Sequence, residues 1–266
     1  MKYSIITINY NNKDGLRKTI ESVINQTYKD FEYIIIDGGS TDGSVDVLKD
    51  YTDKIDYWVS EPDKGIYNAM NKGILQAHGE YLNFMNSGDC FFDNKRLESV
   101  FNSRINADII IGKDYHENPQ TGKRFSSLLP PKISTFYLFE STLPHQSAFI
   151  KNDVIRKDLY DEDLKTISDW KFYFKRILND DCTIEYIDEI ISHREDGGIC
   201  DSNFELVSKE RNIILNQLLW PGIIKDYENI LLLDRTNVSK LLIINENRIA
   251  RRIISLTIKL LYRLFK

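Results

Sequence analysis

The chain has 266 residues, and 42% of them are hydrophobic, which suits one large α/β domain or two smaller ones with a real core. Its net charge of −5 argues against a protein that binds nucleic acid over its whole surface. The three cysteines are far apart and form no C-x-x-C pair, so a reducing cytosol is favoured over a disulfide framework or a zinc site. The opening apolar run is too short for a signal peptide, and no run of about 18 apolar residues predicts a membrane-spanning helix.

Strands and helices are predicted to alternate through the first 111 residues. Strands are predicted over residues 3–8, 31–36, 55–59, 81–86 and 107–111, and helices over residues 14–25, 44–51, 66–78 and 94–102. Asp14 is the expected N-cap of the first helix, and Gly79 is expected to end the third. This alternation predicts an α/β fold, with a mostly parallel sheet covered by helices on both faces.

Polar side chains end four of these strands. They are Thr7 with Asn9, then Asp37, then Asp63, and finally Asn86 with Asp89. Right-handed crossovers bring such ends to one edge of a sheet, where ligands bind in α/β proteins. Acidic and amide groups there suit a polar ligand such as a nucleotide base or ribose. Asp37 has an alternative role, which is to cap the Gly-Gly-Ser-Thr turn that follows it.

Asp89 is a candidate metal ligand at the end of the run Tyr81 to Asp89. Hard cations take carboxylate oxygens and substrate phosphates with few protein ligands, so one carboxylate and a diphosphate would hold Mg²⁺ or Mn²⁺. The alternative is an ordinary turn after a strand. The chain has no G-x-x-x-x-G-K-[ST] loop, and its Gly-Gly-Ser turn lacks the G-x-G-x-x-G spacing of dinucleotide folds.

Residues 112–202 predict a less regular second lobe. A polar loop is expected over residues 113–131, and a turn over residues 193–198. Asp169 begins a predicted helix, where it is either a general base across the cleft from Asp89 or a helix-capping acid. His145 and His193 are candidates for contact with an acceptor or a metal, and the alternative for each is a structural histidine.

Residues 203–266 predict a mostly helical extension. The stretch Arg248 to Lys266 contains six basic residues and no acid, with an apolar stripe at helical spacing. A basic amphipathic helix of this kind lies on anionic membranes, and each cation near such a surface contributes about 1 kcal/mol. The alternative is a helix that docks on the protein itself or on a second copy.

Several of these motifs together resemble glycosyltransferase family 2. They are the opening strand Ser4-Ile-Ile-Thr-Ile-Asn-Tyr-Asn11, the turn Asp37-Gly-Gly-Ser-Thr-Asp-Gly-Ser44, the helix entry Asp63-Lys-Gly-Ile-Tyr-Asn-Ala-Met-Asn-Lys-Gly73, and Asn86-Ser-Gly-Asp89 where the family has D-x-D. The resemblance covers about residues 3–110 and weakens afterwards to His145-Gln146, Ser168-Asp-Trp170 and Gly197-Gly198. Within the family, the chain most resembles bacterial transferases of polysaccharide or colanic-acid type, which share the Asn-Ser-Gly-Asp variant.

The resemblance implies a GT-A fold and an inverting, metal-dependent transfer of a sugar from a nucleotide-diphosphate sugar. It implies that Asp89 binds Mg²⁺ or Mn²⁺ and that Asp169 is the catalytic base. The donor-binding residues that it implies are Thr7, Asn9, Asp37, Asp63, Gly65, Asn71, Asn86 and Ser87.

Two positions depart from the family pattern. Ser87 stands where D-x-D has its first acid, and Ser168 stands where a Glu commonly precedes the base. The Q-x-x-R-W motif of processive synthases is missing, which favours transfer of a single sugar. The leading hypothesis is therefore a peripheral enzyme on the cytoplasmic face of the membrane, with a saccharide or lipid-linked acceptor. The alternatives are a non-catalytic nucleotide-binding partner subunit and a sugar nucleotidyltransferase.

Overall fold

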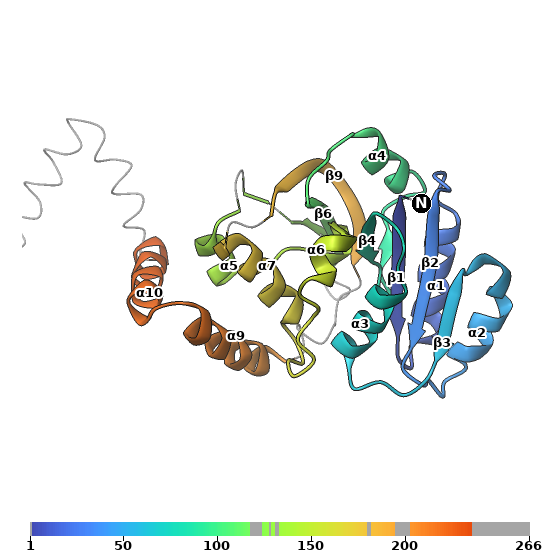
Figure 1. Ribbon diagram of the computed structural model, residues 1–266, viewed down its shortest axis with the longest axis horizontal. Helices are drawn as coiled ribbons and strands as arrows, with labels where there is room; N and C mark the ends of the chain where they lie inside the picture. Colours follow the sequence, from blue (N-terminus) through green and yellow to red (C-terminus); the bar gives the residue numbers. More distant parts are fainter. Residues whose placement is uncertain are drawn as a thin grey trace, which may run out of the picture. The chain divides into compact units, whose positions relative to one another are not determined.

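The computed structural model describes residues 2–117, 124–127, 129–130, 133–179, 182–194 and 203–235 (Figure 1). It consists of two compact units, residues 1–212 and 213–266. The first unit contains one sheet, in the order β3-β2-β1-β4-β8-β6-β9-β5, with β7 paired to β6. The predicted halves 1–111 and 112–202 share this sheet, because β6 (Ile109–Glu117) runs across residue 111.

The first four strands form the parallel half of the sheet. They are β1 (Tyr3–Asn9), β2 (Phe31–Asp37), β3 (Tyr57–Ser60) and β4 (Tyr81–Phe84). The pairs β1–β2, β1–β4 and β2–β3 are all parallel. Strands β1, β2 and β4, which are rich in β-branched and aromatic residues, are buried on both faces, as is usual for the interior of a parallel sheet, whereas the edge strand β3 is only half-buried or exposed. The predicted parallel sheet is confirmed for this half.

Helices cover both faces of the parallel half (Figure 1). They are α1 (Lys13–Ile24), α2 (Ser44–Asp50), α3 (Ile66–Gln76) and α4 (Arg96–Asn102), with a 3₁₀ turn η1 (Thr52–Lys54). On one face, Ile5 belongs to a core cluster with Leu16 and Ile20 of α1. On the other face α3 packs closely, because a Cβ on its Gly73 would lie 2.5 Å from Ile6. Strand side chains alternate between these two faces.

The second half of the sheet is mixed rather than parallel. Its strands are β5 (Cys90–Phe91), β6, β7 (Arg124–Ser126), β8 (Ala148–Lys151) and β9 (Ile184–Arg194). Strand β8 lies antiparallel between β4 and β6, so the fifth predicted strand is not a neighbour of the fourth. The loop predicted over residues 113–131 is partly strand, and β9 includes His193, which the sequence placed in a turn.

The remaining helices of the first unit are short, except for the one that begins at Ser168. They are α5 (Thr135–Glu140), the 3₁₀ turn η2 (His145–Ser147), α6 (Asn152–Arg156) and α7 (Ser168–Asn179). Helix α9 (Phe204–Leu218) runs into the second unit, which also contains α10 (Pro221–Arg235). No helix in the described ranges is both long and apolar enough to cross a bilayer. The basic stretch Arg248 to Lys266 lies outside the described residues, so the membrane helix stays a prediction.

Two local predictions about helix ends are corrected. Asn12, not Asp14, is the N-cap of α1, and its side chain accepts a hydrogen bond from the Gly15 amide. Helix α3 ends at Gln76, and Gly79 does not have the positive φ of a helix stop. Gly79 lacks a side chain for another reason, since a Cβ there would lie 2.6 Å from the backbone nitrogen of Ser4.

Candidate active site

Three strand ends meet at one edge of the sheet, as the topology predicts. Asn9 donates to Asp37 Oδ1 at 2.7 Å, and the Ser60 hydroxyl donates to Asp37 Oδ2 at 2.6 Å. Ser40 donates to the same carboxylate through its amide and its hydroxyl. Burial alone would raise the pKa of Asp37, but these hydrogen bonds to Ser40, Ser60 and Asn9 lower it below its ordinary value. Asp37 is therefore an ionised anchor that ties three strand ends together.

The contacts of Asp37 match the capping alternative, since both carboxylate oxygens serve the turn and the neighbouring strands. Thr7 is fully buried, and its hydroxyl bonds to Tyr33 and to the carbonyl of Met85. The structure thus gives Thr7 an internal role, and its expected contact with the donor stays a prediction. Asn9 is nearly buried, but its Oδ1 has no hydrogen-bond partner among the described residues.

The helix-entry motif begins beside the same edge. Asp63 accepts a hydrogen bond from the Gly65 amide at 2.8 Å, and a Cβ on Gly38 would lie 2.4 Å from the Asp63 carboxylate. The turn after β2 and the turn before α3 therefore touch, and glycine at position 38 makes this approach possible. Gly65 has φ of +121°, and a Cβ there would meet nothing within 4 Å. The space beside Gly65 is open to a ligand.

Asn71 joins helix α3 to the loop before α7. Its Nδ2 donates to the Tyr160 carbonyl and to Glu162, and its Oδ1 accepts from the Tyr160 amide. Asn68, one turn earlier in α3, donates to the other oxygen of Glu162 at 2.8 Å. These contacts fasten the loop to α3 and give Asn71 a structural role, and the contact with the donor that the resemblance implies stays a prediction.

The turn from Asn86 to Asp89 is held by helix α1. Gly88 has φ of +103°, and its amide donates to the Thr19 hydroxyl at 3.0 Å. The same hydroxyl lies 2.6 Å from the Asp89 carbonyl. The Ser87 hydroxyl donates to the Asn12 carbonyl at 3.2 Å, which is a local role for this residue. Thr19 was missed by the sequence reasoning, because a threonine inside an amphipathic helix carries no signal of its own.

Asp169 lies at the start of α7 and is held through both carboxylate oxygens. The Tyr67 hydroxyl donates to Oδ1 at 2.9 Å, and His145 Nδ1 lies 3.2 Å from Oδ2. Burial alone would raise the pKa of Asp169, but the hydrogen bond and charge of His145, with the Tyr67 bond, lower it. Burial lowers the pKa of His145, whereas Asp169 more than reverses this effect and raises it. Both groups therefore favour their charged forms.

The residue after His145 reaches Asp89, the candidate metal ligand. Gln146 Nε2 donates to Asp89 Oδ2 at 3.0 Å, while His145 Nε2 lies 3.1 Å from Asn86 Nδ2. Both ring nitrogens of His145 thus face protein atoms, which leaves neither to a metal in this arrangement. His193 lies in β9 opposite Cys90, with its Nδ1 4.0 Å from the cysteine sulfur and its ring beside Tyr115.

A divalent cation fits this corner only if few protein ligands hold it. Among the described residues, no group of three or more His, Cys, Asp or Glu side chains is arranged to hold a metal. Asp89 supplies a carboxylate, and the buried Oδ1 of Asn86 has no hydrogen-bond partner within the described part of the chain. Such hard oxygen atoms suit Mg²⁺ or Mn²⁺, with phosphate oxygens of a donor as the remaining ligands.

A cavity of about 420 Å³ opens beside Asp169. Its wall includes His145, Gln146 and Trp170, together with polar residues from two strands and one helix. These are Asp114 and His116 of β6, Arg194 of β9 and Arg211 of α9. The Arg211 guanidinium lies 4.9 Å from the centre of the Trp170 ring and donates to the Glu140 carbonyl. Aromatic and polar side chains of this kind suit a hydroxyl-bearing ligand.

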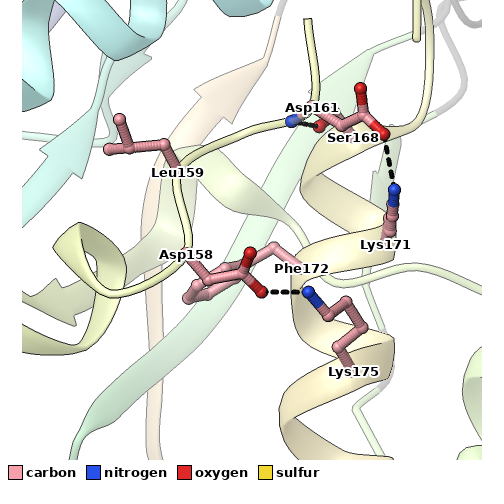
Figure 2. Close-up of a pocket in the computed structure, with 7 residues that line it drawn as sticks. All are labelled: Asp158, Leu159, Asp161, Ser168, Lys171, Phe172 and Lys175. Atoms are coloured by element: carbon pink, nitrogen blue, oxygen red, sulfur yellow. Dashed lines mark hydrogen bonds and ion pairs between the residues drawn. The ribbon is translucent and has the colours of Figure 1, made fainter. Parts of the chain in front are cut away.

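A second cavity, of about 250 Å³, is lined by residues of α7 and of the loop that precedes it (Figure 2). Lys171 and Lys175 reach from the helix toward Asp161 and Asp158, and each pair forms a salt bridge. Ser168 accepts a hydrogen bond from the Asp161 amide at 2.5 Å. These bonds fix the loop that precedes Asp169.

Comparisons with known proteins give the class of this molecule. The family model described as glycosyl transferase family 2 matches residues 4–168. An uncharacterised glycosyltransferase of Mycobacterium tuberculosis is 32% identical over 188 residues, which is 66% of this chain and 68% of the relative. The cholesterol galactosyltransferase of Borreliella burgdorferi is 32% identical over 133 residues, which is 48% of this chain and 37% of that protein.

Solved structures share the fold. Residues 1–349 of TarS from S. aureus, in complex with UDP-GlcNAc, align with a TM-score of 0.64 and 19% identity over 85% of this chain and 70% of that one. The mannosyltransferase PcManGT from Pyrobaculum calidifontis, in complex with GDP-Man and Mn²⁺, aligns with a TM-score of 0.62 and 13% identity over 97% of this chain and 80% of that one. The fold is that of GT-A enzymes. The chain belongs to glycosyltransferase family 2.

Proposed function

We propose that this glycosyltransferase moves one sugar, with inversion, from a nucleotide-diphosphate sugar to an acceptor hydroxyl in surface polysaccharide biosynthesis. The observation that carries the proposal is the position of Asp169. It is ionised, it is held by Tyr67 and His145, and it faces a cavity large enough for part of a saccharide. Asp89 is connected to the same corner through Gln146. A base on one side and a leaving-group site on the other suit a single displacement.

In this displacement an acceptor hydroxyl in the cavity attacks the anomeric carbon and gives its proton to Asp169. The new C–O bond forms as the bond from the anomeric carbon to the phosphate oxygen breaks, and the nucleoside diphosphate leaves with the electron pair. Loss of a general base typically slows a reaction about 10²–10⁴-fold. When bound, Mg²⁺ or Mn²⁺ would stabilise the negative charge on the departing diphosphate, and Asp89 is the residue that would hold it.

The acceptor is proposed to be a saccharide, and a lipid-linked one if the tail from Arg248 to Lys266 lies on an anionic membrane. Such a tail would place the enzyme at the inner face of the membrane, where lipid-linked acceptors are presented. This part of the proposal rests on the sequence pattern, since those residues are outside the described ranges.

The proposal is tested with two variants of the purified chain, Asp169→Asn and Asp89→Ala. We expect Asp169→Asn to bind the donor with unchanged affinity but to release nucleoside diphosphate at least about 10²-fold more slowly. Asp89→Ala should lose donor affinity as well as turnover. A wild-type chain that binds a nucleotide sugar but never turns it over would favour the partner-subunit alternative. Full turnover by Asp169→Asn would reject the base.

A further inference from the structure

Two adjacent residues of the turn η2 hold the two carboxylates of the proposed site. His145 contacts Asp169 Oδ2 at 3.2 Å, and Gln146 donates to Asp89 Oδ2 at 3.0 Å. Asp89 follows β4 and Asp169 begins α7, so they lie in separate elements of the chain. The dipeptide is thus a direct bridge between the residues proposed for the base and for the leaving-group site.

The bridge is anchored by buried polar contacts. The fully buried Asn83 of β4 donates from Nδ2 to the carbonyls of Gln146 and Ala148, both at 2.9 Å. Ser147 bonds through its hydroxyl to Ser192 of β9 at 2.7 Å and to the Lys113 carbonyl at 2.9 Å. Hydrogen bonds to three strands, β4, β6 and β9, therefore fix η2 to the sheet.

We propose that His145 and Gln146 are positioning residues that set the spacing and the orientation of Asp169 relative to Asp89. This inference rests on the proposed function. An in-line displacement requires the base, the anomeric carbon and the leaving oxygen in one arrangement, and an error of about 1 Å can slow a reaction about 10²-fold. A rigid dipeptide with one contact to each carboxylate meets this requirement without touching the substrate.

Other charged and titratable groups also face this bridge. Tyr67 donates to Asp169 from α3, and the buried Tyr160 and Tyr173 lie near the same carboxylate. The charge of Asp89 raises the pKa of His145, and the charge of Arg194 lowers it. Asn86 occupies its far nitrogen. His145 therefore sits between the base and the donor-side turn, with one ring nitrogen directed to each.

The two ring nitrogens can be tested separately with a matched pair of variants. In His145→Asn, the side-chain amide takes the place of Nδ1 and keeps a donor for Asp169. In His145→Gln, the amide takes the place of Nε2 and reaches Asn86 instead. We expect His145→Gln to slow nucleoside diphosphate release 10- to 100-fold, with donor affinity changed less than twofold. His145→Asn should recover most of this loss. His78→Gln, at an exposed side chain, controls for the substitution itself.

The assay uses the full chain, a nucleotide sugar that raises its melting temperature, and water or octyl glucoside as the acceptor. Gln146→Leu, which removes the donor to Asp89 at similar size, should reduce turnover by a similar factor. Equal losses in His145→Asn and His145→Gln, or wild-type turnover in Gln146→Leu, would overturn the inference while leaving the proposed function intact. A wild-type chain that binds the donor but has no turnover would overturn both.

Discussion

Asp169, the proposed base, is a buried carboxylate whose surroundings favour its charged form. Its carboxylate is buried, which by itself raises its pKa, but hydrogen bonds from His145 and Tyr67 stabilise the charged form and lower the pKa below the ordinary 3.8. The lowered pKa therefore favours the ionised form of Asp169. The lower pKa makes Asp169 a weaker base. The contacts with Tyr67 and His145 hold its carboxylate in a fixed orientation toward the cavity.

This balance predicts a change in pH dependence for Tyr67→Phe. The variant loses one hydrogen bond to the carboxylate while burial remains, so the pKa of Asp169 should rise. A base must be deprotonated to act, so activity is lost as pH falls through this pKa. The acid limb of kcat/KM should therefore move to higher pH in the variant.

Tyr173→Phe is the matched control for this measurement. Its hydroxyl is buried near Asp169 but has no hydrogen-bond partner among the described residues. Its removal should leave the acid limb in place. An acid limb that moves equally in both variants, or in neither, would contradict a specific bond between Tyr67 and the base.

At the scale of elements, α3 and the loop before α7 are joined by a small polar latch. Asn71 makes three hydrogen bonds to Tyr160 and Glu162, and Asn68 adds one more to Glu162. Because the loop leads directly to Asp169, these hydrogen bonds fix the position of the proposed base relative to α3 and the edge of the sheet.

We expect Asn71→Ala to lower the free energy of unfolding by about 2–3 kcal/mol, since it leaves the buried amide and carbonyl of Tyr160 without a partner. Asn68→Ala should cost about 1 kcal/mol or less, because its contact with Glu162 is only partly buried. Urea denaturation followed by fluorescence measures both. Equal effects of the two substitutions would show that Asn71 is not the centre of the latch.

The sequence predicted those elements whose signal is local. The β-branched runs of β1 and β2 have strong local signals, and so do the polar ends that meet at Asp37. The position of strand β8 between β4 and β6 could not be predicted, because the residues Ala148 to Lys151 carry no signal for which strands they pair with. Thr7 and Asn71 were placed by family resemblance, but their partners are Tyr33, Met85 and Tyr160, and such contacts depend on the tertiary fold.

For the molecule as a whole, the described chain combines a parallel half of the sheet with a mixed second half. His145 and Gln146 link Asp169 to Asp89. A GT-A fold with this family membership makes a nucleotide sugar the expected partner. The solved neighbours were captured with UDP-GlcNAc or with GDP-Man and Mn²⁺, so both nucleotide classes belong in a search for the donor.

The most direct measurement is the melting temperature of the purified chain against UDP-, GDP- and dTDP-sugars, with and without Mn²⁺, beside Asp89→Ala. A ligand at a hundredfold excess over Kd stabilises the folded state by about 2.7 kcal/mol. For a chain of this size this corresponds to about 5–10 °C. We expect the melting temperature to rise by this amount with one nucleotide class. The rise should be larger with Mn²⁺ and should be lost in Asp89→Ala. A wild-type chain that melts cooperatively and shifts with none of them would contradict it.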